Sequence, residues 1–398
     1  MASEARDRDD ANLISRRVLI RTAGVAAGAI ALAPRIAAAQ ASAPMAPPST
    51  ITTGTRPGPV EVTARIRGSA IFARAIPITI GTALNPPSTH FSISAACLNV
   101  AGSVTFGLQD QIRAGLSDQF GNPIPLGSAV SFFTEGGGIG AQGISPDGLQ
   151  ATANLVTQLP IPDDHRVQVM AVTTGQEPFT DLNGNGQWDP GEPFTDLSPE
   201  PFLDANENGQ YDIGEFFIDS NNNGIRDNGG NGQFDDQILI DVQGPIVFSG
   251  HAQVSIAPVN GAPCTPDDGD CFMLGPGESK QFTVTVSDEA GQPLVAGTTI
   301  MFTGVNVNVS PTQITLPDTD LMPGPGVTEF TVTLTNPPST PAPAPSGGSP
   351  GPTSTPSVQP ASLTVDVTSG GGGTGGSSTQ CPGSNGNASE TIDGTVVR

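Results

Sequence analysis

The sequence predicts an all-β protein built of two homologous β-sandwiches, the first interrupted by an irregular insertion. Three observations support this prediction: a composition rich in Gly and Pro, an internal repeat, and a run of Asp/Asn/Gly loops. The chain has 398 residues, including 50 Gly and 39 Pro. This composition, with many Thr, Val and Ser, favours short strands joined by turns and flexible linkers. The length is sufficient for two or three modules.

The internal repeat has an offset of 170 residues and sets the expected architecture. Residues 111–132 read QIRAGLSDQFGNPIPLGSAVSF, and residues 281–302 read QFTVTVSDEAGQPLVAGTTIMF. Each copy alternates apolar and polar residues, turns at a Gly-x-Pro sequence, and alternates again, as two half-buried strands do. The paired apolar positions are Ile112 with Phe282, Ala114 with Val284, Leu116 with Val286, and Val130 with Ile300. We therefore expect these positions to face two separate cores.

A family resemblance follows from the first copy and the residues after it. The sequence Ser-Asp-x-x-Gly-Asn-Pro-Ile at 117–124, followed by Gly-Ser-x-Val-Ser-Phe at 127–132, resembles the bacterial immunoglobulin-like group 1 (Big-1) domain of invasin and intimin proteins. The resemblance covers about 90–258 well and 260–398 less well. It implies immunoglobulin-like Greek-key sandwiches, which in that family are usually arranged in arrays on a bacterial surface. It brings no receptor-binding motif with it.

These observations give the expected domain organisation. We expect an export signal over 1–40 and an N-terminal β segment over 41–88. The first immunoglobulin-like domain is expected at 89–175 plus 237–259, and the calcium-binding insertion at 176–236. The second immunoglobulin-like domain is expected at 260–398, with a disordered loop over 337–360, where Pro, Ser, Thr and Gly dominate.

The insertion contains two segments that match the calcium-loop pattern D-x-[DN]-x-[DN]-G-x5-E at every fixed position. These segments are 181–192 and 204–215. Calcium is a hard cation that takes six to eight oxygens, which such a loop supplies from positions 1, 3, 5, 7, 9 and 12. The expected ligands are Asp181, Asn183, Asn185, the Gln187 carbonyl, Asp189 and Glu192 in one loop, and Asp204, Asn206, Asn208, the Gln210 carbonyl, Asp212 and Glu215 in the other. Three carboxylates per loop indicate affinities on the order of 10⁻⁴–10⁻³ M.

Two weaker copies follow. The third is expected to use Asp219, Asn221, Asn223, the carbonyl of Ile225, and Asp227, but it has Gly230 at position 12. The fourth is expected to start at Asp227, shared with the third, and to continue through Asn231, Gly232 and Asp235. In that numbering it has Gly229 at position 3 and Ile238 at position 12. The alternative interpretation is that Asn, Asp and Gly only make turns here.

The loops are not expected to form helix–loop–helix EF-hands, because Pro193, Pro199 and Pro201 exclude a regular helix between the first two. A Glu-Pro-Phe-x-Asp sequence recurs at 177–181, 192–196 and 200–204, with Glu-Phe-Phe-Ile-Asp at 215–219. We expect these links to be extended. The ligand spacing resembles that of thrombospondin type 3 repeats and, more loosely, dockerins. Trp188, Tyr211 and Phe234 occupy position 8 in three copies, where we expect an apolar anchor facing a neighbouring loop.

The net charge limits the classes of partner that can be expected. The net charge is −23, and residues 177–241 hold 15 of the 38 acidic residues with Arg226 as their one basic residue. This acidity excludes nucleic acid as the expected partner.

The N-terminus resembles an export signal. Adjacent Arg16 and Arg17 before an apolar run, followed by alanines at 37–39, predict export by a twin-arginine signal to the periplasm, cell surface or exterior. A general secretion signal is the alternative. The run at 18–33 is too short and Ala/Gly-rich to favour a membrane anchor, and no membrane span is expected in the mature chain.

The four cysteines are typical of an oxidising compartment. Cys264 and Cys271 enclose a short loop and form the expected pair, whereas the sequence leaves open whether Cys97 and Cys381 are bonded. The three histidines stand far apart in sequence, and no nucleophile elbow, zinc-protease motif or phosphate loop is present. We therefore expect no enzyme. A hydrolase using the clustered carboxylates is the least favoured alternative.

Two functional hypotheses remain. The first is a secreted or cell-surface structural protein whose cofactor is Ca²⁺, bound in the insertion. The second is an adhesin or carbohydrate-binding module that uses the calcium segment to contact a cell-surface glycan or protein.

Overall fold

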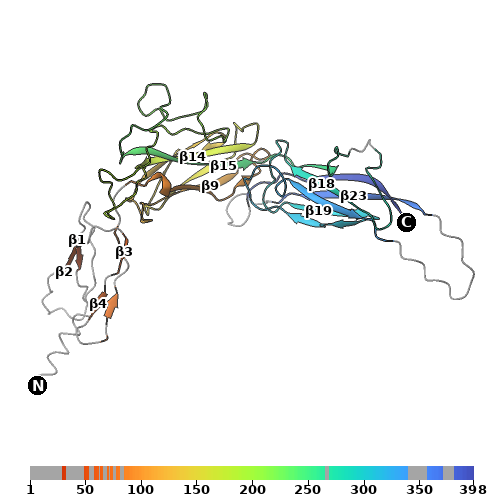
Figure 1. The fold of residues 1–398 in the computed structure, drawn as a ribbon, viewed down its shortest axis with the longest axis horizontal. Helices are drawn as coiled ribbons and strands as arrows, with labels where there is room; N and C mark the ends of the chain where they lie inside the picture. The colour runs from red at the N-terminus through yellow and green to blue at the C-terminus, as the bar shows by residue number, and fades with distance from the viewer. Residues whose placement is uncertain are drawn as a thin grey trace, which may run out of the picture.

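The computed structural model describes residues 85–264, 269–338, 356–370 and 381–398, with short strands and isolated residues between 29 and 80. Within this part of the chain the regular structure is β-strand, apart from one short 3-10 turn, η1 (Ser88–His90). Two sandwiches lie end to end, and the insertion loops emerge on one side of the first (Figure 1). The predicted all-β fold with two sandwiches is confirmed. None of the described residues forms a helix long and apolar enough to cross a membrane.

The first sandwich has a five-stranded sheet in the order β12-β10-β14-β15-β8 and a four-stranded sheet in the order β11-β13-β9-β7. Its strands are β7 (Phe91–Ala95), β8 (Asn99–Val100), β9 (Gln109–Leu116), β10 (Ala129–Thr134), β11 (Gly138–Ile139), β12 (Gln142–Ile144), β13 (Gln150–Val156), β14 (Arg166–Gly175) and β15 (Ile238–Phe248). The pairings are antiparallel except that of β8 with β15.

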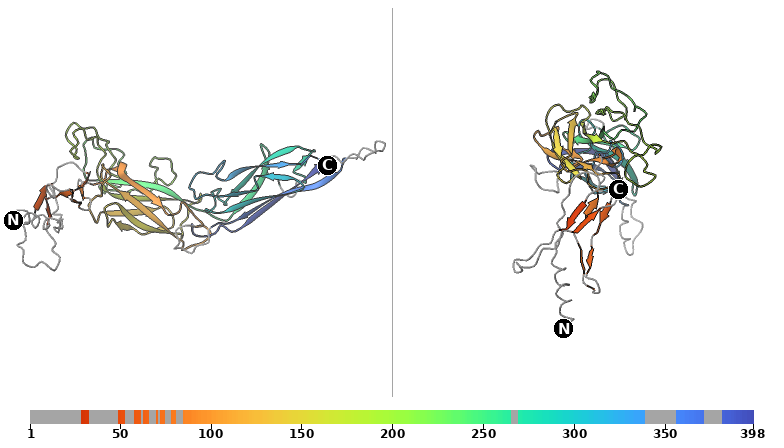
Figure 2. Two further views of the ribbon diagram at one scale, coloured as in Figure 1. Left: turned by 90° about the horizontal axis from the view of Figure 1, so that it is seen from below. Right: turned by 90° about the vertical axis from the view of Figure 1, so that its left-hand side faces the viewer.

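The second sandwich repeats this plan with sheets in the orders β16-β18-β22-β20 and β17-β24-β23-β19-β21. Its strands are β16 (Gln253–Pro258), β17 (Phe272–Leu274), β18 (Ser279–Ser287), β19 (Thr299–Val305), β20 (Asn308–Ser310), β21 (Gln313–Thr315), β22 (Glu329–Thr335), β23 (Val358–Thr368) and β24 (Ala388–Val397). Again one pair, β17 with β24, is parallel. Figure 2 shows the two sandwiches in succession from a second direction.

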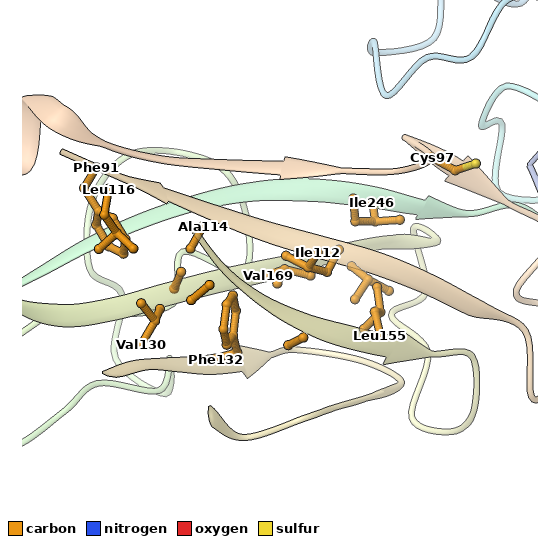
Figure 3. Packing of buried hydrophobic residues seen from close by; sticks show 14 of the residues in the cluster. Phe91, Cys97, Ile112, Ala114, Leu116, Val130, Phe132, Leu155, Val169 and Ile246 are labelled. Carbon is orange, nitrogen blue, oxygen red and sulfur yellow. The ribbon is translucent and has the colours of Figure 1, made fainter. Parts of the chain in front are cut away.

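The internal repeat forms the same part of each core. All eight paired apolar positions, from Ile112 with Phe282 to Val130 with Ile300, are buried. The two strands of each copy lie in opposite sheets, so the Gly-x-Pro turn carries the chain across the sandwich. The side chains between the sheets of the first domain, including Ile112, Phe132 and Leu155, are seen in Figure 3. Alternation of burial along β9 and β18 is the period-2 pattern of a half-buried strand.

Two expected boundaries are wrong. Strand β16 pairs with β18 of the second sandwich, so the first domain ends with β15 rather than near residue 259. Strand β23 already begins at Val358, inside the loop expected over 337–360, because its residues extend the long pairing with β24. Residues 339–355 of that loop lie outside the described part of the chain. So does the predicted export signal, except for β1 (Ala29–Leu32).

The N-terminal β segment contributes short antiparallel pairs. The strands are β2 (Ser49–Thr52), β3 (Gly58–Val60), β4 (Thr63–Arg65), β5 (Phe72–Arg74) and β6 (Ile78–Ile80). Strand β1 pairs with β2, β3 with β6, and β4 with β5. These three pairs are separate from the sheets of the sandwiches.

The insertion covers the outer face of the five-stranded sheet. Met170 and Val172 of β14 form a small buried cluster with Leu203 of the insertion. The Phe133 and Phe216 rings lie beside this cluster, with centroids 5.1 Å apart. Because the insertion packs there, β14 is buried on both faces, unlike the alternating β9. The insertion is therefore anchored to the central strand of the five-stranded sheet.

A disulfide bond joins the two domains between Cys97 and Cys381. The predicted bond between Cys264 and Cys271 is not formed among the described residues. The reason lies in the domain packing: Cys97 follows β7 at the end of the first sandwich that meets the second (Figure 3). The segment before β24 brings Cys381 to the same place, where the N–H of Ala101 donates to the Pro382 carbonyl.

Polar contacts fasten the same junction. The Asp318 carboxylate accepts hydrogen bonds from the N–H groups of Leu98 and Asn99 at 3.0–3.1 Å. The buried Asp288 carboxylate accepts from the Gly250 N–H at 2.8 Å and contacts His165 Nδ1 at 2.7 Å. Asp318 and Asp288 belong to the second sandwich, whereas Leu98, Asn99 and His165 belong to the first, so the contacts between them exist only when the sandwiches are docked.

One buried carboxylate near this junction predicts a pH-dependent stability. Asp110 is 4% exposed; its Oδ1 accepts from the Cys97 N–H, while its Oδ2 has no hydrogen-bond partner in the structure. Burial, with a contribution from the Asp318 charge, raises the pKa of Asp110 to about 7. The folded protein thus holds a proton that the unfolded chain releases, so stability falls as pH rises from about 4 to about 7.

Replacing Asp110 with Asn is expected to raise the free energy of unfolding at pH 8 by about 1–3 kcal/mol, because it removes the buried charge. Urea unfolding at pH 5 and pH 8 would measure this change. Exposed Asp163 is the control position, where the change to Asn should have no comparable effect. An equal effect of Asp110→Asn at both pH values would contradict the assignment.

Candidate metal centre

The two complete loops share one pattern of hydrogen bonds. In the first, the Asp181 carboxylate accepts from the N–H groups of Gly184, Asn185 and Gly186. The Glu192 carboxylate accepts from the N–H groups at positions 2 and 9, at 2.7 and 2.9 Å. The side-chain amides at positions 3 and 5 both donate to the Oδ2 of the position-9 Asp. The acidic side chains therefore converge on one turn of backbone.

The second loop repeats this pattern. Asp204 accepts from the N–H groups of Asn208 and Gly209, and Glu215 accepts from those at positions 2 and 9. Asn206 and Asn208 donate to Asp212, which lowers the pKa of that carboxyl. In both loops the N–H of position 7, Gln187 or Gln210, donates to the position-5 Asn. That bond fixes the backbone at position 7, and the carbonyl of the same residue is the predicted ligand.

The third loop is completed by a residue that the sequence did not suggest. Asp219, Asn221, Asn223 and Asp227 make the contacts of positions 1, 3, 5 and 9, and the Ile225 N–H donates to Asn223. Gly230, which the sequence spacing puts at position 12, has no side chain to fill that position. Instead, Glu200 Oε1 accepts from the Ser220 N–H at 3.0 Å and Oε2 from the Asp227 N–H at 2.8 Å. These are the position-2 and position-9 contacts, so Glu200 fills position 12.

The fourth loop is assembled from three separate parts of the chain. The expected first residue, Asp227, belongs to the third loop, and Ile238 lies buried in β15. Asp196 takes position 1, because its Oδ2 accepts from the Gly232 N–H at 2.9 Å. Glu177 takes position 12, accepting from the N–H groups of Leu197 and Asp235 at 2.8 and 3.0 Å. The expected start of this copy at Asp227 was therefore wrong, and position 12, where the sequence spacing has the unsuitable Ile238, is taken by Glu177.

The four loops form two nested pairs. Isolated antiparallel bridges join Phe179 to Phe194 and Phe202 to Phe217, so the recurring Glu-Pro-Phe-x-Asp links pair with one another. In the first pair, Glu192 closes the loop that begins at Asp181, and Glu177 closes the loop that begins at Asp196. In the second pair, Glu215 closes the loop that begins at Asp204, and Glu200 closes the loop that begins at Asp219. The fourth loop is interrupted between Leu197 and Asn231, and this interruption contains the whole second pair. The recurring link was the signal in the sequence that could have revealed Glu177, Asp196 and Glu200.

The position-8 side chains join the loops within a pair. The Trp188 and Phe234 rings stack with centroids 4.9 Å apart, as expected for an anchor facing a neighbouring loop. Tyr211 instead faces Arg226, the position-8 residue of the third loop, whose guanidinium lies 5.3 Å from the Tyr211 centroid and 4.4 Å from that of Phe202. One contact between position-8 side chains thus joins the loops of each pair. It is ring stacking in the first pair and a cation–π contact in the second.

The charge of this segment is concentrated in the loops. Each loop holds three carboxylates, and together they account for twelve of the fifteen acidic residues of 177–241. Glu177 and Glu200 are fully buried, and Glu192 and Asp204 are 7% exposed. Burial, together with the charges of Asp196 and Asp235, raises the pKa of Glu177. Carboxylates buried beside like charges favour a bound cation that supplies the missing positive charge.

The donor set fits a hard divalent cation. Each loop offers carboxylate and amide oxygens, the ligands that Ca²⁺ prefers. The turn glycines at position 6, such as Gly186 and Gly209, have φ values of 82° and 76°, in the left-handed region that favours glycine. No residue of this segment offers a thiolate or an imidazole, which would favour a softer metal.

Elsewhere in the described chain, one group of three Cys/Asp ligand atoms lies within 4.8 Å of one another, formed by Cys97, Asp318 and Cys381. The two sulfurs of this group are joined in the disulfide, so they do not form a metal site. The loop carboxylates do not gather as tightly.

A cavity of about 420 Å³ lies between the sheet and the second loop. It is lined by Phe133, Leu203 and Phe216, with the carboxylates of Glu135 and Glu215. Burial raises the pKa of Glu135 to about 7, and the nearby charges of Asp164, Glu207 and Glu215 act in the same direction. The residues that line the cavity thus include both apolar and acidic side chains.

Comparisons with known proteins find likeness in structure only. No protein-family model matches the sequence, and no curated protein matches it. The adhesin InvE of Yersinia pseudotuberculosis is 10% identical, with a TM-score of 0.23 over 79% of this chain and 61% of that one. The D0-D1 domain of intimin is 10% identical, with a TM-score of 0.21 over 77% of this chain and 97% of that one. Invasin, a bacterial integrin-binding protein, is 13% identical, with a TM-score of 0.24 over 81% of this chain and 44% of that one.

The chain thus spans less than two thirds of the InvE and invasin structures. The matching proteins include invasin and intimin, to which the sequence also showed a resemblance. Because the scores and identities are low, we take the function from this chain's own residues.

Proposed function

We propose that this is an exported structural protein in which two immunoglobulin-like sandwiches are stiffened by a calcium-loaded insertion. The observation that carries the proposal is the position-12 contact, made four times by a buried or part-buried Glu. Glu192 and Glu215 make it within their own loops, whereas Glu177 and Glu200 reach it from other segments. Ordinary turns do not require a distant carboxylate to return to the same two N–H groups.

The proposed role of calcium is to neutralise the insertion. Without a cation, twelve carboxylates repel one another on one face of the first sandwich. Bound ions offset this repulsion and stabilise the folded insertion by mass action. In a compartment with millimolar calcium, sites with Kd on the order of 10⁻⁴–10⁻³ M are partly or largely filled. The disulfide and the signal-like N-terminus support placement outside the cytoplasm.

Counting the calcium retained per chain at equilibrium with millimolar calcium tests the proposal. We expect one ion for each of the four loops, together with a change in Trp188 fluorescence that a chelator reverses. Trp188 reports on the first pair because its indole N–H donates to the Glu192 carbonyl at 3.0 Å. If the chain binds no calcium and its emission is unchanged, the proposal is wrong.

A second candidate function is an adhesin or carbohydrate-binding module that uses the insertion as its contact surface. The observation favouring it is a set of exposed apolar side chains on the loops. Leu182, Ile213 and Ile225 are 69%, 102% and 70% exposed. Binding to a glycan array that disappears when Asp204 and Glu215 are both replaced would support a metal-bridged contact. Unchanged binding after this double replacement would exclude that contact.

A further inference from the structure

Arg166, the first residue of β14, connects the calcium insertion to the second sandwich. It is 5% exposed. Its Nε and Nη2 donate to the two carboxylate oxygens of Glu207 at 2.6 and 2.9 Å. Its Nη1 donates to the carbonyl of Asp320, in the second domain, at 2.7 Å. One guanidinium therefore bridges the insertion and the neighbouring domain.

Glu207 lies inside the second loop but is not one of its ligands. It occupies position 4, between the position-3 and position-5 residues Asn206 and Asn208. Its backbone has a φ of 58°, in the left-handed region that residues other than glycine rarely adopt. The surrounding loop must hold this conformation, because an isolated Glu would avoid it. The place of the Glu207 carboxylate thus depends on how well the loop is ordered.

The residue that Arg166 contacts in the second domain lies next to other contacts between the domains. Asp320 is two residues beyond Asp318, whose carboxylate binds the N–H groups of Leu98 and Asn99. Loss of Glu207 would leave the buried Arg166 charge without its carboxylate, and an uncompensated buried charge is costly. Arg166 would then move or recruit water, and its bond to Asp320 would weaken.

We propose that calcium bound in the second loop controls how stably the two sandwiches contact each other, and that it acts through Glu207 and Arg166. This inference rests on the proposed calcium binding and adds a regulatory consequence to it. An ordered second loop holds Glu207 on Arg166, and Arg166 then holds the 318–320 segment against the first domain. An empty loop releases that restraint, while the disulfide between Cys97 and Cys381 keeps the domains attached.

Amide hydrogen exchange of the full chain, followed by mass spectrometry with and without calcium, tests this coupling. Calcium is expected to slow exchange in the peptide containing Leu98 and Asn99 by about fivefold or more. Glu207→Gln should abolish this slowing while retaining the full calcium count, because Glu207 is not a ligand. Arg166→Lys keeps the charge but cannot make the two parallel bonds, so it should also reduce the slowing.

Asp236→Asn is the matched control, since Asp236 is an exposed acidic residue of the insertion outside the four loops. It should behave as the unmodified chain. The coupling is overturned if the unmodified chain binds calcium without slowed exchange at the junction, or if Glu207→Gln responds as fully as the control. A chain that binds no calcium at all overturns the proposed function itself, which the calcium count distinguishes from failure of the coupling.

Discussion

Replacing Glu200 with Gln is expected to remove one calcium ion per chain, although Glu200 lies nineteen residues before the first ligand of the loop it closes. The change keeps the size of the side chain and removes the charge at position 12, where calcium loops use a bidentate Glu. Affinity at the third loop should fall by about 10–100-fold or more, as losses of metal-site groups do. Equilibrium dialysis at millimolar calcium would count the ions.

Two comparisons make this result specific. Glu177→Gln should remove a different ion, at the fourth loop. Compared with Glu200→Gln, this change should alter the environment of Trp188 strongly, because Phe234 of the fourth loop stacks on Trp188. Asp236→Asn should leave the count unchanged. If Glu200→Gln retained every ion while Glu192→Gln lost one, the assignment of Glu200 to the third loop would be wrong.

Removing the bond between Cys97 and Cys381 should have the largest effect on stability. The two cysteines are 284 residues apart, so the bond restricts the unfolded chain over most of the described protein. Replacing both with Ser is expected to lower the free energy of unfolding by about 2–5 kcal/mol. Denaturant unfolding with a nonreducing buffer measures the change, and sequencing of a nonreduced digest identifies the linked peptides.

Cys264→Ser provides the control for this prediction. Cys264 is half-buried at the edge of the second core and is not bonded in the structure. Its replacement should cost less than about 1 kcal/mol, as changes away from a core or a cross-link usually do. A linked peptide containing Cys264 and Cys271, with none joining Cys97 to Cys381, would refute the proposed junction.

Local patterns were enough to predict much of the fold and site. Alternation at Ile112–Leu116 and Phe282–Val286 identified core strands, because a half-buried strand must place every second residue inward. The loops at 181–192 and 204–215 could be recognised in the sequence because each is a continuous segment, and calcium binding by their side chains stays a prediction. Asp110 and β14 departed from these patterns: a carboxylate occupies an inward position of β9, and β14 is buried on both faces under the insertion.

The sequence by itself determined the strands, the two complete loops and the acidity of the insertion, since each depends on residues close together in the chain. Only the tertiary structure decided which Glu closes the third and fourth loops, that β16 belongs to the second sandwich, and that Cys97 bonds to Cys381. All three depend on segments far apart in sequence meeting in space. The spacing of residues along the chain does not predict these long-range contacts. They depend on how the links of the insertion pair and how the two sandwiches dock.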